Sequence, residues 1–245
     1  DDGVSLLNKP FSGVKNEFSI SSYFKTNNLS TVQTIYGHGG GYQDVGLQIQ
    51  EHSGIYKLEF FILTSTAEMG YVYAEVDSGA WHYAVATYDG QAIKLYLNGS
   101  LIDEKSFSGS LDWSASSNFY GPNIGGGDSD WLHTLDGNID DFSFWDLALT
   151  QSEIQSYMNT QLTGQESGLV AYWDFNEGEG TSLADVSGGG NYGTVDGATW
   201  STDTPDSLSL FFEEDVPGCT DSFAMNFDGD ATADDGSCTY PDSGD

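Results

Sequence analysis

The stretch that most constrains the fold of this chain is WHYAVATYDGQAIKLYLNGSLIDEKSF, residues 81–107. It contains two turn signals, Asp89-Gly90 and Asn98-Gly99, and both dipeptides tolerate the positive φ angles that tight hairpin turns require. Between the turns every second residue is apolar, which is the period of two typical of a half-buried strand: Ile93, Leu95 and Leu97. The stretch therefore predicts three short antiparallel strands joined as a meander.

Further strand-like runs precede the meander at regular short spacing. They are residues 18–24, 32–36, 45–50, 56–63 and 71–76. The one clear helix signal follows later, where Thr150-Gln151-Ser152-Glu153 forms a capping box and Leu149 and Ile154 form a hydrophobic staple. Many short strands with a single helix predict an all-β sandwich rather than an alternating α/β fold.

Two of these segments carry a family resemblance. The motif Trp81-x-x-Ala84-Val85-x-x-Tyr88-Asp89-Gly90, with the hairpin that follows it, resembles the central hairpin of laminin-G-like domains. The segment LDGNIDDFSFW, residues 135–145, which continues to the capping box, resembles the strand and helix that close such domains. The resemblance implies a two-sheet antiparallel jelly roll of the concanavalin A-like, pentraxin-related kind over residues 4–205.

The domain organisation follows from a change of composition after Trp200. Residues 168–175 return to strand character, and too few residues follow for an independent sandwich, so we assign them to the same domain. We expect a sandwich over residues 1–205, a linker over 206–217 and an acidic module over 218–245 that holds both cysteines. The opening residues 1–3 carry no signal-peptide pattern, which indicates a processed chain or a piece of a longer protein.

The charge of the chain excludes some partners. It has 38 acidic residues against six lysines and no arginine, a formal net charge of -32. Such a surface repels nucleic-acid phosphates and anionic lipid headgroups, and no apolar run is long enough to cross a bilayer. Two explanations of the acidity remain open: calcium as a cofactor, and solubility in a salty medium.

The C-terminal module contains Cys219 and Cys238, and an even count in a polar segment predicts a disulfide and an extracellular, secreted or cell-surface location. Its GCTD…DDGSC pattern resembles a short module that recurs in secreted surface proteins of marine Bacteroidetes. Oxygen ligands at spacings of two predict a calcium site, although position six and the closing glutamate of an EF-hand are missing. The expected ligands are Asn226, Asp228, Asp230, Asp234 and Asp235, and the alternative is a plain disulfide-bonded acidic loop.

A second calcium site is expected in the sandwich. Asp140 and Asp141 lie in a predicted strand and would point to opposite faces, so one of them needs a partner that this lysine-poor chain barely supplies. We expect Asp140 to share a calcium ion with Asp174 or Asp185. The alternative is a carboxylate that accepts hydrogen bonds from main-chain amides in a turn.

Carbohydrate contact is expected at a glycine-rich loop, because that loop joins carboxylates and an indole. The candidate ligand-binding residues are Asn123, Asp128, Asp130 and Trp131. The alternative is that the aromatic residues serve packing. The Glu-x-Asp-x-(x)-Glu strand of concanavalin A-like glycosidases does not occur, so no catalytic residue is expected.

These observations lead to a noncatalytic extracellular adhesion or recognition module that binds carbohydrate or a surface protein as part of a larger protein. The main alternative is a structural building block of a filament or giant adhesin that contacts flanking domains or copies of itself. A glycoside hydrolase is the weakest alternative.

Overall fold

The structure is a computed structural model that describes residues 3–8, 11, 13–39, 44–64, 68–112, 120–126, 133–205, 217–228, 231 and 233–240. The chain divides into two compact units, Asp1–Pro205 and Asp206–Asp245.

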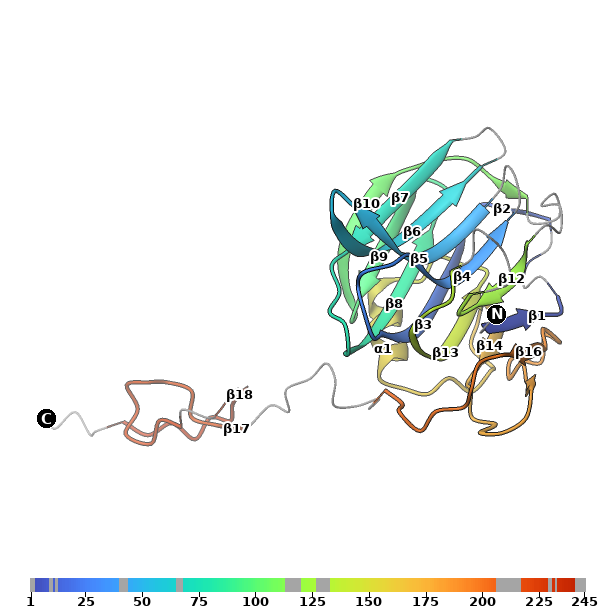
Figure 1. Cartoon of the computed structure of the whole chain (residues 1–245). Coiled ribbons are helices and arrows are strands. Elements are labelled where there is room, and N and C mark those ends of the chain that lie inside the picture. The colour runs from blue at the N-terminus through green and yellow to red at the C-terminus, as the bar shows by residue number, and fades with distance from the viewer. Residues whose placement is uncertain are drawn as a thin grey trace, which may run out of the picture. The chain divides into compact units, whose positions relative to one another are not determined.

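The first unit is a sandwich of two antiparallel sheets (Figure 1). Among the described residues the larger sheet has eight strands in the order β15-β16-β1-β12-β4-β5-β6-β7, and the smaller has six in the order β10-β9-β8-β3-β13-β14. The larger sheet contains β1 (Gly3–Leu6), β4 (Gln33–Gly39), β5 (Asp44–His52), β6 (Ile55–Leu63), β7 (Met69–Ala74), β12 (Tyr120–Ile124), β15 (Ser182–Leu183) and β16 (Gly193–Asp196). The smaller sheet contains β3 (Phe18–Thr26), β8 (Trp81–Tyr88), β9 (Ala92–Leu97), β10 (Ser100–Ser106), β13 (Gly137–Trp145) and β14 (Leu169–Trp173). A separate short pair joins β2 (Val14–Lys15) to β11 (Leu111–Asp112). The all-β jelly-roll prediction is confirmed.

The predicted meander is β8, β9 and β10, and its two turns differ. Asn98 and Gly99 both have positive φ, at 51° and 75°, as a two-residue hairpin turn with the sheet's own twist requires. At the other turn only Gly90 has positive φ. The Asp89 carboxylate instead accepts hydrogen bonds from the amides of Gln91 and Ala92, which makes a three-residue loop.

Aromatic side chains fill the space between the sheets. Phe142 and Phe144 of β13 point inward, where each packs against Tyr36 of β4 and Trp173 of β14, with ring centroids 5.0–6.2 Å apart. All four side chains are completely buried. Each such burial contributes roughly 1.5–3 kcal/mol, so this cluster fixes how the two sheets face each other.

The single α-helix of the described residues, α1 (Gln151–Met158), lies against the outer face of the smaller sheet. Its predicted capping box is present, with Thr150 and Glu153 exchanging hydrogen bonds. Ile154 and Met158 are buried, and Tyr157 stacks on Trp145 with ring centroids 4.8 Å apart. The helix thereby covers the outward side of β13.

The segment after α1 closes both sheets. β14 pairs with β13 in the smaller sheet, and β16 pairs with β1 in the larger one. Residues 168–196 therefore belong to the same sandwich.

At the opposite side of the sandwich the two outermost strands protect each other. The Asp103 carboxylate of β10 accepts a hydrogen bond from the amide of Tyr73 in β7, with 3.0 Å between the oxygen and the nitrogen. The Lys105 ammonium lies 4.1 Å from the ring centroid of Tyr71. Charged side chains at open edges discourage pairing with strands of other molecules.

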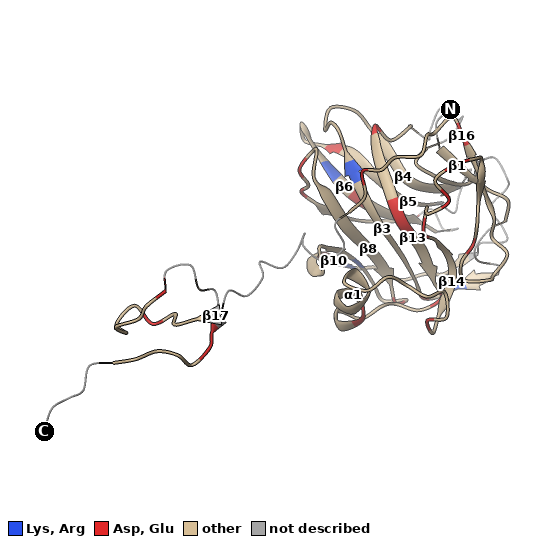
Figure 2. Ribbon diagram, turned by 90° about the horizontal axis from the view of Figure 1, so that it is seen from below, with Lys and Arg blue, Asp and Glu red and all other residues tan. Residues whose placement is uncertain are grey.

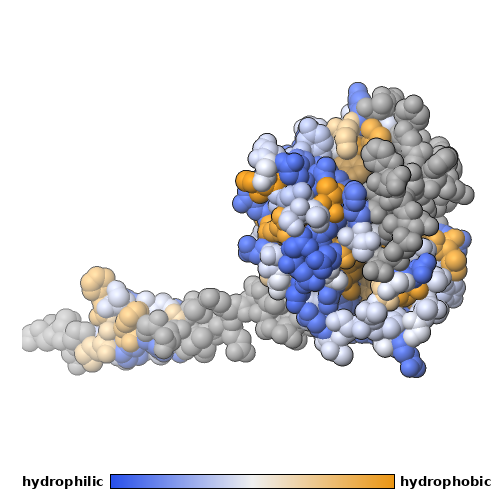
Figure 3. All heavy atoms as spheres, viewed as in Figure 1, coloured by the Kyte–Doolittle hydropathy of each residue, from blue (hydrophilic) through white to orange (hydrophobic). Residues whose placement is uncertain are grey.

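The described surface is polar. Acidic residues are spread over its loops and strands and outnumber the lysines (Figure 2). On the face in Figure 3, apolar residues of the first unit lie in small groups among hydrophilic ones. No helix in the described part of the chain has the length and apolar character of a membrane span.

The second unit contains a short parallel pair, β17 (Pro217–Gly218) with β18 (Ala233–Asp234). A disulfide joins Cys219 to Cys238, as the cysteine count predicts.

Candidate functional site

A hollow of about 730 Å³ opens where the two sheets separate beside β1 and β13. We call it the edge hollow. Its volume lies within the range of roughly 300–1,000 Å³ that is usual for small-molecule sites. The lining residues are Gly3, Val4, Asn27, Ile124, Gly125, Thr134, Leu135, Asp136, Gly137, Asn138, Ile139, Asp140, Phe175, Val195, Gly197, Ala198, Thr199, Trp200, Ser201, Asp203 and Thr204.

Two aromatic residues line the edge hollow, and both are fixed by contacts with neighbouring parts of the chain. Trp200 donates its indole N–H to the carbonyl of Gly180 at 2.8 Å and packs partly against the core. Phe175 also packs against the core, and its backbone has a φ of 50°. Positive φ is strained for a bulky side chain, and strained residues of this kind tend to cluster at functional sites.

Two of the three carboxylates that line the hollow are engaged by neighbouring groups. Asp136 accepts hydrogen bonds from the side-chain amides of Asn27 and Asn28. Asp203 pairs with the Lys25 ammonium at 2.6 Å and accepts the Trp81 indole N–H at 3.1 Å. The Lys25 and Trp81 contacts hold the pKa of Asp203 below its usual value.

The third carboxylate, Asp140, lies at an irregularity in β13. The pairing of β13 with β3 shifts register between Asp140 and Ser143, and Asp141 has a φ of 48°. The bulge breaks the alternation of side chains at this point: Asp140 is among the lining residues of the hollow, and the neighbouring Asp141 carboxylate accepts the Tyr172 hydroxyl. Burial raises the pKa of Asp140 to about 7, and the neighbouring Asp141 carboxylate adds to the rise.

Burial also raises the pKa of Asp141, although the hydrogen bond from Tyr172 opposes the rise. Asp174, which follows β14, is close enough for its charge to raise the pKa of both Asp140 and Asp141. The structure therefore brings together two of the predicted sandwich ligands, Asp140 and Asp174.

Asp185 has a different environment. Its two oxygens accept hydrogen bonds from the amides of Tyr172, Ser187 and Asn191 and from the side chains of Ser187 and Asn191. Burial alone would raise its pKa, but these donors outweigh burial and hold the pKa below the usual value. Asp185 is therefore a carboxylate that accepts hydrogen bonds from main-chain amides, which is the alternative to a calcium ligand that the sequence left open.

The carboxylate oxygens of these aspartates are the type of ligand that calcium prefers. The described residues, however, contain no group of three or more His, Cys, Asp or Glu side chains placed to hold a metal ion. The expected calcium sites remain predictions.

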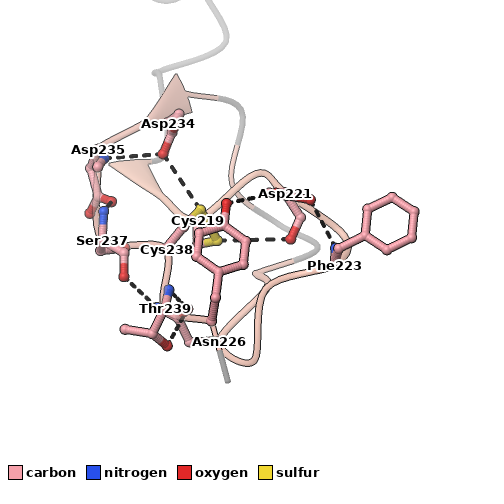
Figure 4. The surroundings of a disulfide bond; sticks show 11 residues. Cys219, Asp221, Phe223, Asn226, Asp234, Asp235, Ser237, Cys238 and Thr239 are labelled. Carbon is pink, nitrogen blue, oxygen red and sulfur yellow. Dashed lines mark hydrogen bonds between the residues drawn. A yellow bond between two sulfur atoms is a disulfide. The ribbon is translucent and has the colours of Figure 1, made fainter. Parts of the chain in front are cut away.

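In the cysteine module, three of the described candidate ligands make local hydrogen bonds: Asn226, Asp234 and Asp235 (Figure 4). The Asn226 side chain donates to the carbonyl of Ser237 and accepts from the amide of Thr239, and Asp235 accepts from the amide of Ser237 at 2.8 Å. Asp234 accepts from the amide of Gly236 at 3.1 Å. Asp228 is described, whereas Asp230 lies outside the described residues.

The carbohydrate loop predicted from the sequence is not described, since Asp128, Asp130 and Trp131 lie outside the described residues. Asn123 lies in β12, opposite Ser5 of β1 and Gly37 of β4, and does not line the edge hollow.

Sequence reasoning missed Phe175, Trp200, Asn138 and Asp203 as candidate contacts. Only Trp200 had a usable signal, because a tryptophan in an otherwise polar stretch such as Thr199–Thr204 is unusual unless its ring has a packing or binding role.

Comparison with known proteins gives the family context. Residues 1–155 match the Laminin_G_3 model, which describes the concanavalin A-like lectin/glucanases superfamily. Pappalysin-1 of Homo sapiens is 37% identical over 96 residues, which cover 34% of this chain and 5% of pappalysin-1. Pappalysin-1 of Mus musculus is 36% identical over 84 residues. The chain thus spans about 5% of the length of these curated relatives.

Two solved structures share the fold. A proposed carbohydrate-binding protein from Bacteroides ovatus aligns with a TM-score of 0.66 at 19% identity, covering 80% of this chain and 56% of that one. A heptameric SAP-like pentraxin from Limulus polyphemus aligns with a TM-score of 0.51 at 13% identity, covering 80% of this chain and 89% of that one. At these identities the likeness shows the fold alone.

Proposed function

Because this chain belongs to the concanavalin A-like lectin/glucanases superfamily through its Laminin_G_3 region, we propose that it is a noncatalytic extracellular module that binds carbohydrate. The B. ovatus protein with the same fold has a proposed carbohydrate-binding role, which supports this choice.

The edge hollow is the observation that carries the proposal. Carbohydrate recognition needs an apolar ring against which a sugar can lie and polar groups that take its hydroxyls. In the hollow, Trp200 and Phe175 are the rings against which a sugar could lie. Asn138 and Asp140 are the polar residues that could take its hydroxyls. All four belong to the described part of the first unit, so the site needs nothing from the second.

The state of the carboxylates supports a binding role rather than glycoside hydrolysis. Hydrolysis by the usual route requires two carboxyl groups that flank the scissile bond, one to donate a proton and one to act as base or nucleophile. In the hollow, Asp136 is engaged by two asparagine amides and Asp203 by Lys25 and Trp81. Asp140 is left without a second free carboxyl group among the lining residues.

An extracellular location is part of the proposal. The disulfide between Cys219 and Cys238 persists in oxidising compartments, and the polar acidic surface suits a secreted or surface-displayed protein.

A glycan array tests the proposal, with the whole chain applied in calcium and again in EDTA. We expect Trp200→Ala to reduce binding about tenfold or more, since truncating a central tryptophan commonly costs about 2 kcal/mol. Tyr192→Ala is the matched control, because Tyr192 is an exposed aromatic residue that does not line the hollow. Trp131→Ala tests the loop predicted from the sequence. Failure to bind any glycan would contradict the proposal.

One observation favours the second candidate, a structural module that contacts protein. In the cysteine module Phe223 and Met225 are 87% and 70% exposed, and Tyr240 is 56% exposed. Exposed apolar side chains of this size often mark protein contacts. Sedimentation of the whole chain and of Phe223→Ser would test it, because self-association that the variant abolishes would support this candidate.

A further inference from the structure

The edge hollow has an asymmetric distribution of charge. Three carboxylates line it, and no lysine or histidine is among the lining residues. The Lys25 ammonium reaches the lining residue Asp203, and its ion pair with that carboxylate engages its charge. Among its described lining residues, the hollow thus presents carboxylates and no cationic side chain that could receive an anionic ligand.

Asp140, one of the lining residues, has one carboxylate oxygen without a hydrogen-bond donor among the described residues. Oδ1 of Asp140 accepts the amide of Asp141 at 2.9 Å, whereas none of the described residues donates to Oδ2. An acceptor in a partly buried hollow binds best when a ligand supplies an N–H or O–H group, and hydrogen bonds to charged acceptors are the stronger class. Asn138 stands two residues before Asp140 on β13 and also lines the hollow, but its amide donates to Ser201 and to the carbonyl of Asp203.

The apolar side of the hollow is firm. Trp200 is fixed by its hydrogen bond to Gly180, and Ile139 and Val195 pack against the core beside it. A ligand that lies there must bring an apolar face together with its donors, which is the character of a sugar ring.

We infer that the edge hollow selects sugar units that lack an anionic group, with hydroxyl or ammonium donors directed to Asp140 and an apolar ring face against Trp200 or Phe175. Uronic, sialic and sulfated sugars are rejected at a pH above about 7, where Asp140 is ionised, because a second negative charge close to that carboxylate in a partly buried site is repelled and no lysine or histidine is among the described lining residues. This inference rests on the proposed carbohydrate function and adds the ligand class and the residue that sets it.

The test compares oligomers of glucose, glucosamine and glucuronic acid of equal length, alongside an array that carries neutral, amino and anionic families. Calorimetric titration of the strongest hit follows. We expect binding to neutral or amino sugars, at least about tenfold weaker binding to the uronic counterpart, and about tenfold loss in Asp140→Asn for the preferred sugar. In the same variant the affinities for neutral and uronic sugars should lie closer together, because the charge that repels the uronic sugar has been removed.

Asp196→Asn is the matched control. It makes the same change of charge at an exposed residue that does not line the hollow, and we expect unchanged affinities. Binding confined to anionic glycans, or an unchanged affinity in Asp140→Asn, overturns the inference while the carbohydrate function stands. Binding to no glycan at all overturns the proposed function, and this inference with it.

Discussion

The carboxylate of Asp185 accepts a hydrogen bond from the main-chain amide of Tyr172, with 3.1 Å between oxygen and nitrogen. Tyr172 lies in β14, the outermost described strand of the smaller sheet on this side, and its amide finds its acceptor in the Asp185 carboxylate. The loop from Asp185 to Asn191 thus protects the open edge in place of a further strand. Trp173 strengthens the closure by donating its indole N–H to the carbonyl of Asn191 at 2.8 Å.

Replacement of Asp185 by alanine is expected to destabilise the sandwich. The change removes the carboxylate that accepts five hydrogen bonds. It leaves the buried main-chain amides of Tyr172 and Asn191 without that acceptor. We expect the free energy of unfolding to fall by about 3 kcal/mol, measured by urea denaturation with tryptophan fluorescence. Asp196→Ala, at an exposed position, should change it by less than about 0.5 kcal/mol. Equal effects of the two variants would show that the loop does not depend on Asp185.

The stability of the sandwich is expected to decline as pH rises from about 5 to 8. The pKa of Asp140 is about 7 in the folded chain, raised first by burial and then by Asp141, against roughly 4 in an unfolded chain. Between these values the folded state binds more protons, so raising the pH favours unfolding. Asp140 is partly exposed, and solvent screening reduces the expected loss to on the order of 1 kcal/mol.

Calorimetric melting temperatures across this pH range provide the measurement, and Asp140→Asn should flatten the curve. Asp185 acts with the opposite sign, since its pKa is lowered in the folded state and its contribution is lost as pH falls below about 4. A melting temperature that rises steadily from pH 5 to 8 in the native chain would contradict the role given to Asp140.

Calcium is expected to raise the melting temperature if the acidic residues act as ligands. Asp140 and Asp141 form no ion pair with any described lysine, and a divalent cation would relieve the repulsion between them. The measurement is a thermal melt in calcium and in EDTA, since a ligand bound only by the folded state stabilises it in proportion to the logarithm of its concentration. Identical melts would assign the acidity to solvation.

Reduction of the disulfide is expected to affect the cysteine module and leave the sandwich intact. The bond between Cys219 and Cys238 encloses a loop of about 20 residues and contributes about 3 kcal/mol by restricting the unfolded chain. The sandwich has its own core and contains no cysteine. Limited proteolysis after reduction should therefore cleave within residues 217–240 first, while the melting transition of residues 1–205 is unchanged. The double variant Cys219→Ser/Cys238→Ser should behave like the reduced chain.

Features of the fold that depend on neighbours in sequence could be predicted. Asn and Gly both tolerate the positive φ of a tight turn, so the turn at Asn98-Gly99 follows from those two residues alone. The capping box of Thr150 and Glu153 likewise depends on only four residues. Most of the longer β strands were readable because alternation is a local pattern, although their ends moved by up to three residues, whereas the short strands β12, β15 and β16 were not predicted.

The edge hollow could not be predicted in the same way. It is formed by segments near residues 3, 125, 137 and 200, and their meeting depends on strand order rather than on any local pattern. The bulge at Asp140 and Asp141 was equally hidden, because strict alternation would have placed one side chain on each face. Asp185 was read as a calcium candidate because a carboxylate that serves an edge amide looks the same in sequence as one that serves a metal ion.

Asp203 joins the segment after β16 to Lys25 of β3 and Trp81 of β8, two residues before the sandwich ends at Pro205. Mechanical tension applied along the chain beyond Pro205 reaches the sandwich first at this contact. An exposed ion pair contributes only about 1 kcal/mol or less, so it would yield before any pairing between strands. Residues 199–204 would then peel away and take Trp200 with them, which makes the wall of the hollow sensitive to force.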